Sequence, residues 1–182
     1  ILNQQRRSDK NNQRRPASVL AFIENHDTDR FLGEGNNLPM LKQASTLLLT
    51  TRRIPQLYYG TEVMMNGVKS KSDGYVRKDF PGGWTGDATN ALTPAGRTKI
   101  QNECYDFYKT ILNWRKGNDV IAKGSMVQFM VQNGVYAYAR QYEGKTIFVM
   151  LNGTDAETTV PLKFYKEILK DSKQGKDILS GK

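Results

Sequence analysis

A short apolar run at residues 19–23 constrains the fold more than any other part of the sequence. It reads Val-Leu-Ala-Phe-Ile, and the polar residues Glu24, Asn25, His26 and Asp27 follow it directly. An unbroken apolar run of this length is typical of a strand buried on both faces, as in a parallel sheet. In α/β folds, ligands and catalytic groups gather at the C-terminal ends of such strands. The chain's only histidine is therefore predicted to lie at such an end, although a polar turn that caps a strand has the same pattern.

Two later segments have the apolar spacing of helices. Residues 39–52 and 94–116 carry apolar side chains three and four positions apart, and Thr93 precedes a proline at the start of the second segment. Threonine caps helix N-termini, and proline is favoured at the first helical position. Between these helices we expect a short strand at residues 56–59, and then loops over residues 62–84. Loops of this length in a compact domain are usually functional, so we expect them to form the wall of a cleft.

The last third of the sequence predicts antiparallel strands. Asn-Gly pairs occur at 133–134 and 152–153, and Glu143-Gly144 lies between them. Asn-Gly is a strong hairpin signal. The strands are predicted at residues 127–131, 135–140, 146–151 and 158–160. We place the domain boundary near Gly117, so that residues 1–117 form one domain and residues 118–182 form a second, all-β domain.

Three motifs resemble those of the α-amylase family of glycoside hydrolases. The segment from Phe22 to Asp27 is similar to the family's Phe-x-x-Asn-His-Asp motif on the seventh barrel strand. Residues 54–62, Ile-Pro-Gln-Leu-Tyr-Tyr-Gly-Thr-Glu, resemble a segment on the eighth strand. Residues 76–84, Val-Arg-Lys-Asp-Phe-Pro-Gly-Gly-Trp, resemble a loop of the neopullulanase and cyclomaltodextrinase branch. The motifs occur in family order, so together they are far more specific than any one alone.

The resemblance implies a fold of the α/β plus all-β class. Residues 1–117 would be the last strands and helices of a (β/α)8 TIM barrel, and residues 118–182 an antiparallel β-sandwich that need not be complete. The chain begins at Ile1 rather than at methionine, which is typical of an internal fragment, a processed product or an expressed piece. The lack of a targeting signal therefore says nothing about the parent protein, for which the family favours a periplasmic or secreted location.

The resemblance also assigns roles to individual side chains. Asp27 would be a catalytic carboxylate that stabilises an oxocarbenium-like transition state. Around it, we expect the substrate-binding residues to be Asn25, His26, Arg30, Phe80 and Trp84. Retaining glycosidases also need a nucleophile and a general acid, and the family carries both on earlier strands. The chain alone is therefore expected to be inactive, while its parent would cleave α-glucosidic bonds in malto-oligosaccharides or starch-type glucans. No metal or cofactor is expected, and the oligomeric state is left open.

Composition leaves two other classes of function to weigh. The net charge of +9 suggests nucleic-acid binding, but much of the excess lies in residues 1–15, which we expect to be a solvated arm or loop. No apolar run is long enough to span a membrane. The single cysteine, Cys104, is predicted to lie buried on a helix face. The main alternative to a glycosidase is a non-catalytic carbohydrate-binding or structural module. For a glycosidase, and for a carbohydrate-binding module, the expected partner is an α-glucan oligosaccharide.

Overall fold

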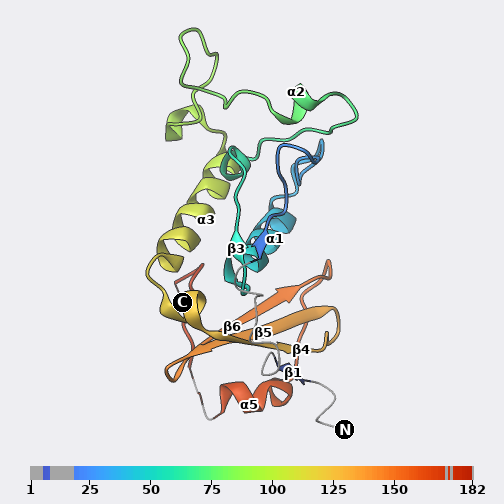
Figure 1. The fold of residues 1–182 in the computed structure, drawn as a ribbon, viewed down its shortest axis with the longest axis vertical. Helices are drawn as coiled ribbons and strands as arrows, with labels where there is room; N and C mark the ends of the chain where they lie inside the picture. Colours follow the sequence, from blue (N-terminus) through green and yellow to red (C-terminus); the bar gives the residue numbers. More distant parts are fainter. Residues whose placement is uncertain (1–5, 9–18, 171, 173, 182) are drawn as a thin grey trace. The chain divides into compact units, whose positions relative to one another are not determined.

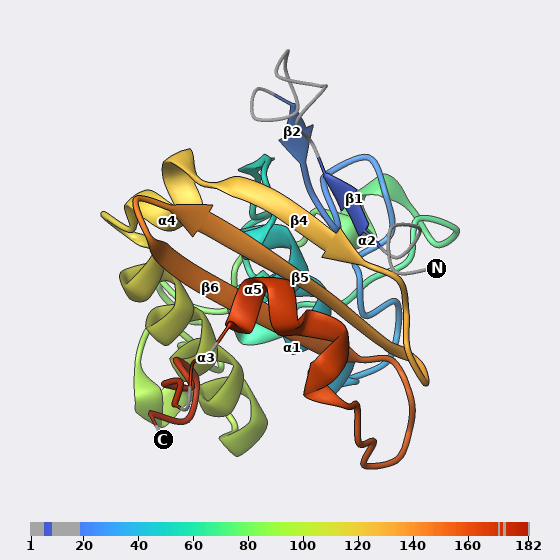
Figure 2. The same cartoon turned by 90° about the horizontal axis from the view of Figure 1, so that it is seen from below.

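The protein consists of two compact units in the computed structural model, which describes residues 6–8, 19–170, 172 and 174–181. We call residues 20–49 with 54–114 the helical unit. The described residues within 1–19, 50–53 and 115–182 are the sheet unit. Figures 1 and 2 show the ribbon from two directions.

The helical unit begins with a βαβ arrangement. Strand β2 (Leu20–Ala21), helix α1 (Leu38–Thr50) and strand β3 (Ile54–Pro55) follow one another, and β2 pairs with β3 in parallel. The 3-10 turn η4 (Thr61–Val63), the short helix α2 (Asp73–Val76), the 3-10 turn η5 (Pro94–Gly96) and the long helix α3 (Lys99–Arg115) come after them. Figure 1 shows that irregular chain dominates between β3 and α3.

The predicted buried strand is shorter and more exposed than expected. Only residues 20 and 21 are in strand conformation, and Leu20 and Phe22 are 53% and 44% exposed. The reason is that β2 has a single neighbour, β3, and two strands cannot cover both of their own faces. The strand expected at residues 56–59 is also wrong. The observed strand, β3, ends at Pro55, and the Gln56 amide then donates one further hydrogen bond to the Ala21 carbonyl (2.8 Å).

Helix α3 begins later than the sequence predicted. Thr93 does cap a turn, but that turn is η5, and Arg97 then returns to extended backbone. The helix starts instead from a capping box, the reciprocal arrangement in which a cap side chain and a side chain three residues later bond each other's backbone N–H. Here the Gln101 amide donates to Thr98 Oγ1 (3.3 Å) and the Thr98 amide donates to Gln101 Oε1 (2.9 Å). The Thr-x-x-Gln sequence from Thr98 to Gln101 is the signal for the start of α3, whereas Thr93-Pro94 is the signal for the start of η5.

Helices α1 and α3 share one hydrophobic core. Its buried members lie on α1, on α3, on the chain before α1 and on the chain between the two helices: Leu32, Leu38, Leu41, Leu49, Met64, Cys104, Phe107, Tyr108 and Ile111. Cys104 is fully buried, as predicted, and its thiol donates to the Thr61 carbonyl (3.6 Å). The core therefore joins the two helices to the turn that follows β3.

Burial of the Cys104 thiol makes a testable pH prediction. Desolvation, followed by the charge of Glu62, raises the pKa of this thiol from 9.0 to about 12. The folded state then holds the proton more tightly than the unfolded state, so the stability linked to this group is complete below pH 9 and is lost as the pH rises toward 12. We expect negligible reaction of Cys104 with a disulfide reagent at pH 8 in the native protein, and rapid reaction in urea. Equal rates in both conditions would contradict the burial.

The sheet unit is a four-stranded antiparallel sheet in the order β1-β4-β5-β6. Its strands are β1 (Arg6–Ser8), β4 (Ser125–Phe129), β5 (Val135–Tyr142) and β6 (Lys145–Asn152). The short helix α4 (Asp119–Lys123) precedes β4, while η6 (Leu162–Tyr165) and α5 (Lys166–Leu169) follow β6. Strands β4, β5 and β6 and the two turns between them were correctly predicted, with Asn133, Gly134, Glu143 and Gly144 all at positive φ.

Alternate side chains of the sheet form two separate clusters, as the period of a strand requires. One face carries Met126, Tyr138 and Val149. The other carries Val127, Ala139 and Ile168 of α5, with Phe129 and Phe148 against them. Figure 2 shows α5 lying over this second face. Within the described residues of the sheet unit, all four strands belong to one sheet, so the second sheet of the expected β-sandwich is not seen there.

Two expectations for the sheet unit are wrong. Residues 158–160 form no strand, because Thr154 and Asn152 bond the nearby backbone instead: the Thr154 amide donates to Asn152 Oδ1 (3.0 Å), and Asn152 Nδ2 donates to the Ala156 carbonyl (2.8 Å). Such local bonds compete with strand pairing. Residues 6–8, expected to be part of an irregular arm, form β1 because the edge of β4 offers backbone partners. The rest of that predicted arm lies outside the described residues.

Candidate functional site

The candidate site is the turn that follows β2, Asn25 to Asp29, with the loop that covers it. Asn25 Oδ1 accepts from the Asp27 amide (2.7 Å), and Thr28 Oγ1 accepts from the Asn25 amide (3.1 Å). Side-chain bonds of this kind stabilise a tight turn. The turn leaves the side chains of His26 and Asp27 on the surface, each 59% exposed. The sequence thus placed the two polar side chains correctly at the end of a parallel strand.

Both carboxylate oxygens of Asp27 have partners. Oδ2 lies 3.1 Å from His26 Nε2, and Oδ1 accepts from Arg77 Nη2 at 3.0 Å. Arg77 also donates through Nε to the His26 carbonyl (2.9 Å) and through Nη2 to Asp73 Oδ2 (3.1 Å). One guanidinium therefore contacts two carboxylates and the backbone of the turn.

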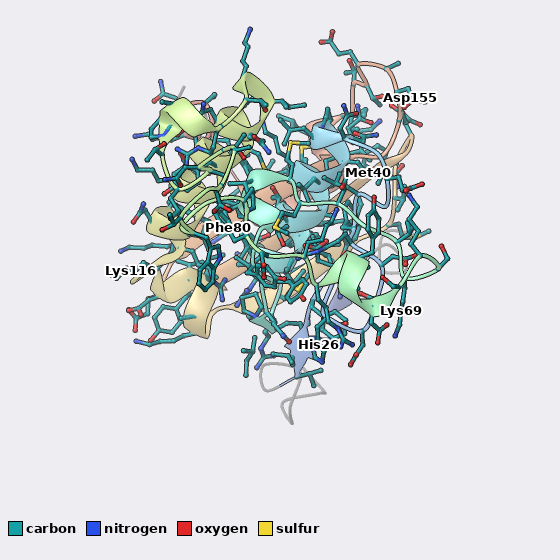
Figure 3. All side chains as sticks on the ribbon, turned by 90° about the horizontal axis from the view of Figure 1, so that it is seen from above. His26, Met40, Lys69, Phe80, Lys116 and Asp155 are labelled. Carbon is teal, nitrogen blue, oxygen red and sulfur yellow. The ribbon has the colours of Figure 1, made fainter. Side chains whose placement is uncertain are left out.

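Lys69 is a second cation at this turn. Its Nζ donates to the Asp27 carbonyl (3.0 Å) and lies 3.6 Å from Asp73 Oδ1, and its amide donates to Asp29 Oδ1 (2.5 Å). Figure 3 shows Lys69 and His26 on the same side of the helical unit. The loop from residue 66 to residue 77 is thus fastened to the turn at several points.

A glycine allows two segments of this loop, around Gly67 and Tyr75, to lie close together. Gly67 donates to the Gly33 carbonyl (2.7 Å) and accepts from the Arg30 amide (3.0 Å). A Cβ added at Gly67 would lie 2.7 Å from the Tyr75 carbonyl oxygen, which is closer than real Cβ atoms approach. Glycine is the residue that permits such a close backbone approach.

A buried ion pair between Glu24 and Arg30, the residues on either side of the turn, holds the turn in place. Glu24 and Arg30 are 2% and 1% exposed, and Arg30 Nη1 lies 3.4 Å from Glu24 Oε1. Glu24 also accepts from the Phe31 amide (2.5 Å) and from the Thr61 hydroxyl. Its contacts fix the chain on both sides of the Asn-His-Asp turn. Glu24 is thus a structural carboxylate.

The prediction that Arg30 contacts substrate is corrected by its burial. Its guanidinium donates to the carbonyls of Val76 (3.0 Å) and Tyr59 (2.6 Å) and lies 4.0 Å above the Tyr58 ring. A cation this deep needs partners; Nε and Nη1 have them, whereas Nη2 has no hydrogen-bond partner among the described residues. Arg30 therefore holds the loops together beneath the site.

The two aromatic residues expected at the site lie on the loop after Arg77. Phe80 is half-buried, and Trp84 is 70% exposed, with its amide donating to Asp87 Oδ2 (2.9 Å). Figure 3 places Phe80 well apart from His26 and Lys69. The structure thus brings together Asn25, His26 and Asp27, and it does not bring Phe80 to them.

Sequence reasoning missed the three residues that hold the turn from the loop. Lys69, Asp73 and Arg77 are 42 to 50 positions from Asp27, which no local pattern can reveal. The available signal was the i, i+4 spacing that joins Lys69 to Asp73 and Asp73 to Arg77, which favours ion pairs on a helix. Across the described part of the chain, no cluster of three or more His, Cys, Asp or Glu side chains could hold a metal ion. None of the described helices is long and apolar enough to cross a membrane.

Comparison with known proteins defines the class. Residues 126–182 match the family model of the cyclo-malto-dextrinase C-terminal domain. An α-amylase from Niallia circulans is 29% identical over 170 residues, which cover 89% of this chain and 29% of that protein. A cyclomaltodextrin glucanotransferase from Thermoanaerobacterium thermosulfurigenes is 31% identical over 159 residues, 83% of this chain and 20% of that protein.

Solved structures agree with these matches. An α-amylase from Geobacillus thermoleovorans in complex with acarbose has a TM-score of 0.60 and 27% identity, over 80% of this chain and 30% of that one. A maltogenic amylase from S. marinus has a TM-score of 0.64 over 88% of this chain and 20% of that one; at 18% identity it shows the fold alone. The chain is therefore similar to enzymes of the α-amylase family of glycoside hydrolases, the family that its motifs resemble. It spans less than a third of the length of these relatives.

Proposed function

We propose that this chain forms part of a retaining glycosidase that acts on α-glucosidic bonds of malto-oligosaccharides. It would contribute the last strands and helices of a (β/α)8 barrel and the adjoining C-terminal β-domain, in an enzyme of the neopullulanase or cyclomaltodextrinase type. The relatives are α-amylases and cyclomaltodextrin glucanotransferases, which supports a glucan substrate. The observation that carries the proposal is an exposed carboxylate, Asp27, paired with an imidazole at the end of a parallel strand.

The exposed apolar side chains of the short parallel sheet support a larger barrel. Leu20 of β2 and Ile54 of β3 are 53% and 49% exposed, and Phe22, directly after β2, is 44% exposed. Parallel sheets are normally covered on both faces, so apolar residues on β2 and β3 favour further strands and helices around them. The β2-α1-β3 order is also the repeating unit of such barrels.

In this proposal each residue of the turn has a separate task. The Asp27 carboxylate stabilises the positive charge that develops on the sugar ring, an effect that grows toward the transition state. His26 donates a hydrogen bond to a hydroxyl of the sugar being cleaved. Asn25 orients the turn, a task supported by its bond to the Asp27 amide. Trp84, which is 70% exposed, and Phe80 offer aromatic faces to other sugar units.

The chain alone is expected not to hydrolyse maltodextrin. Retention requires a nucleophile and a general acid about 5–5.5 Å apart on either side of the bond. Near Asp27, Glu24 is buried against Arg30, and Asp29 and Asp73 bond to Lys69 and Arg77. Each of these carboxylates is already bonded to another group of the chain. Reducing-end assays on maltoheptaose should stay at the buffer level, and clear turnover would show that the chain holds its own nucleophile.

Acarbose binding tests the proposed role of Asp27 directly. We expect acarbose to perturb the NMR signals of His26 and Asp27, and we expect Asp27→Asn to weaken binding about tenfold or more, because a charge-assisted hydrogen bond contributes about 1.5–3 kcal/mol. Asp106→Asn on α3 removes one exposed carboxylate in the same unit and is the matched control. Unchanged affinity in Asp27→Asn would reject the assigned role and leave a non-catalytic carbohydrate-binding or structural module as the better description.

A further inference from the structure

Arg77 lies where one side chain can set the geometry of the whole turn. It contacts Asp27 Oδ1 at 3.0 Å, the His26 carbonyl at 2.9 Å and Asp73 Oδ2 at 3.1 Å. These bonds join three separate groups, two of them on consecutive residues of the Asn-His-Asp turn. We propose that Arg77 is the positioning residue for Asp27 and His26, an inference that rests on the proposed function of that pair.

The backbone of Arg77 is itself held in place. Arg77 ends helix α2, and its amide donates to the carbonyls of Asp73 (3.1 Å) and Gly74 (3.2 Å). Ser72 caps the other end of α2 by accepting from the Tyr75 amide (3.1 Å). The guanidinium therefore starts from a fixed point, and its planar donors can hold several acceptors in one orientation. Lysine has no such fork and could not keep these three bonds at once.

The charges around Asp27 explain why Asp73 is part of this arrangement. Asp27, Asp29 and Asp73 bring three negative charges, and Arg77 and Lys69 bring two positive charges. One net negative charge is left at the turn. Because Asp73 shares the guanidinium, Arg77 can orient the Asp27 carboxylate without cancelling the charge that stabilises a cationic sugar.

The position of the guanidinium also orders the imidazole. Arg77 binds Oδ1 of Asp27, which leaves Oδ2 toward His26 Nε2 at 3.1 Å. His26 is thereby held by its own carbonyl and by the neighbouring carboxylate. Loss of Arg77 would remove both restraints together, so His26 and Asp27 should lose order as a pair.

The test compares Arg77→Gln with Lys78→Gln in the full chain. Lys78 is the neighbouring cation, and it lies 4.1 Å above the Tyr75 ring. We expect Arg77→Gln to lower the backbone order parameters of residues 26–28 from the rigid value of about 0.85 toward 0.6, with the melting temperature unchanged. We also expect acarbose affinity to fall about fivefold, as for an exposed ion pair. Arg77→Lys should not restore either quantity, and Lys78→Gln should change neither.

The outcomes separate this inference from the proposed function. If Asp27→Asn weakens acarbose binding while Arg77→Gln leaves order and affinity unchanged, Arg77 has no positioning role and the proposed function stands. Stronger binding by Arg77→Gln would show that Arg77 competes with the sugar, which also overturns the inference. If the unaltered chain does not bind acarbose, the proposed sugar site fails, and the order parameters of residues 26–28 alone decide whether Arg77 positions the turn.

Discussion

Replacing Arg140 by methionine is expected to lower the free energy of unfolding of the sheet unit by about 3 kcal/mol or more. Arg140 is fully buried on β5. Its guanidinium donates to four backbone carbonyls, those of Thr50 (2.9 Å), Ile121 (2.8 Å), Gly124 (2.8 Å) and Ser125 (3.2 Å). A buried acceptor left without its donor costs about 1–3 kcal/mol, and methionine removes all of these donors at once. Within the sheet unit, Arg140 therefore joins Thr50 and helix α4 to the sheet.

Amide hydrogen exchange is the suitable measurement for this variant. Both tryptophans of the chain, Trp84 and Trp114, belong to the helical unit, so their fluorescence does not report on the sheet. We expect faster exchange in β4, β5 and β6 of Arg140→Met, with α1 and α3 little changed. Lys145→Met on the same sheet is the control, because Lys145 is exposed. Equal protection in both variants would show that the buried guanidinium contributes little.

Replacing Glu24 by alanine is expected to destabilise the helical unit by about 3–5 kcal/mol. The change leaves the Arg30 guanidinium, 1% exposed, without its carboxylate. It also removes the acceptor of the Phe31 amide and of the Thr61 hydroxyl. Breaking a buried pair on one side is costly because the remaining charge has no water around it.

Tryptophan fluorescence in a urea titration measures this second effect. Trp114 packs against the core shared by α1 and α3, so its signal follows unfolding of the helical unit. The matched control is Glu34→Ala, which removes an exposed carboxylate paired with Lys71 and should change stability by no more than about 1 kcal/mol. A shift of the midpoint no larger than that of the control would contradict a structural role for Glu24.

Local signals were sufficient for several elements of the fold. The apolar spacing predicted α1 and most of α3, and Asn133-Gly134 predicted the hairpin between β4 and β5. These features depend on residues within a few positions of one another, so backbone propensity and side-chain periodicity decide them. Where two local signals competed, as at Thr93 and Thr98, the sequence did not say which threonine begins the long helix.

Contacts between distant residues decided what the sequence did not show. Pairing with β4 turned residues 6–8 into a strand, and the bonds of Asn152 and Thr154 kept residues 158–160 out of one. Burial changed the interpretation of Arg30 from a substrate contact to a structural cation. The residues that brace the candidate site, Lys69 and Arg77, were likewise found only in the folded chain.

The sequence by itself determined helix α1, most of helix α3, the hairpins of the sheet unit and the adjacent polar triplet from Asn25 to Asp27, because turn residues and periodicity are properties of neighbouring residues. Tertiary structure alone decided that Glu24 and Arg30 lie buried beneath the triplet and that Arg77 reaches it from a loop fifty positions away. The physical reason is that burial and ion pairing depend on which chain segments meet in space. In this protein the segments are held together by hydrogen bonds to backbone carbonyls and by close approaches at glycines. Neither kind of contact produces a periodic pattern in the sequence.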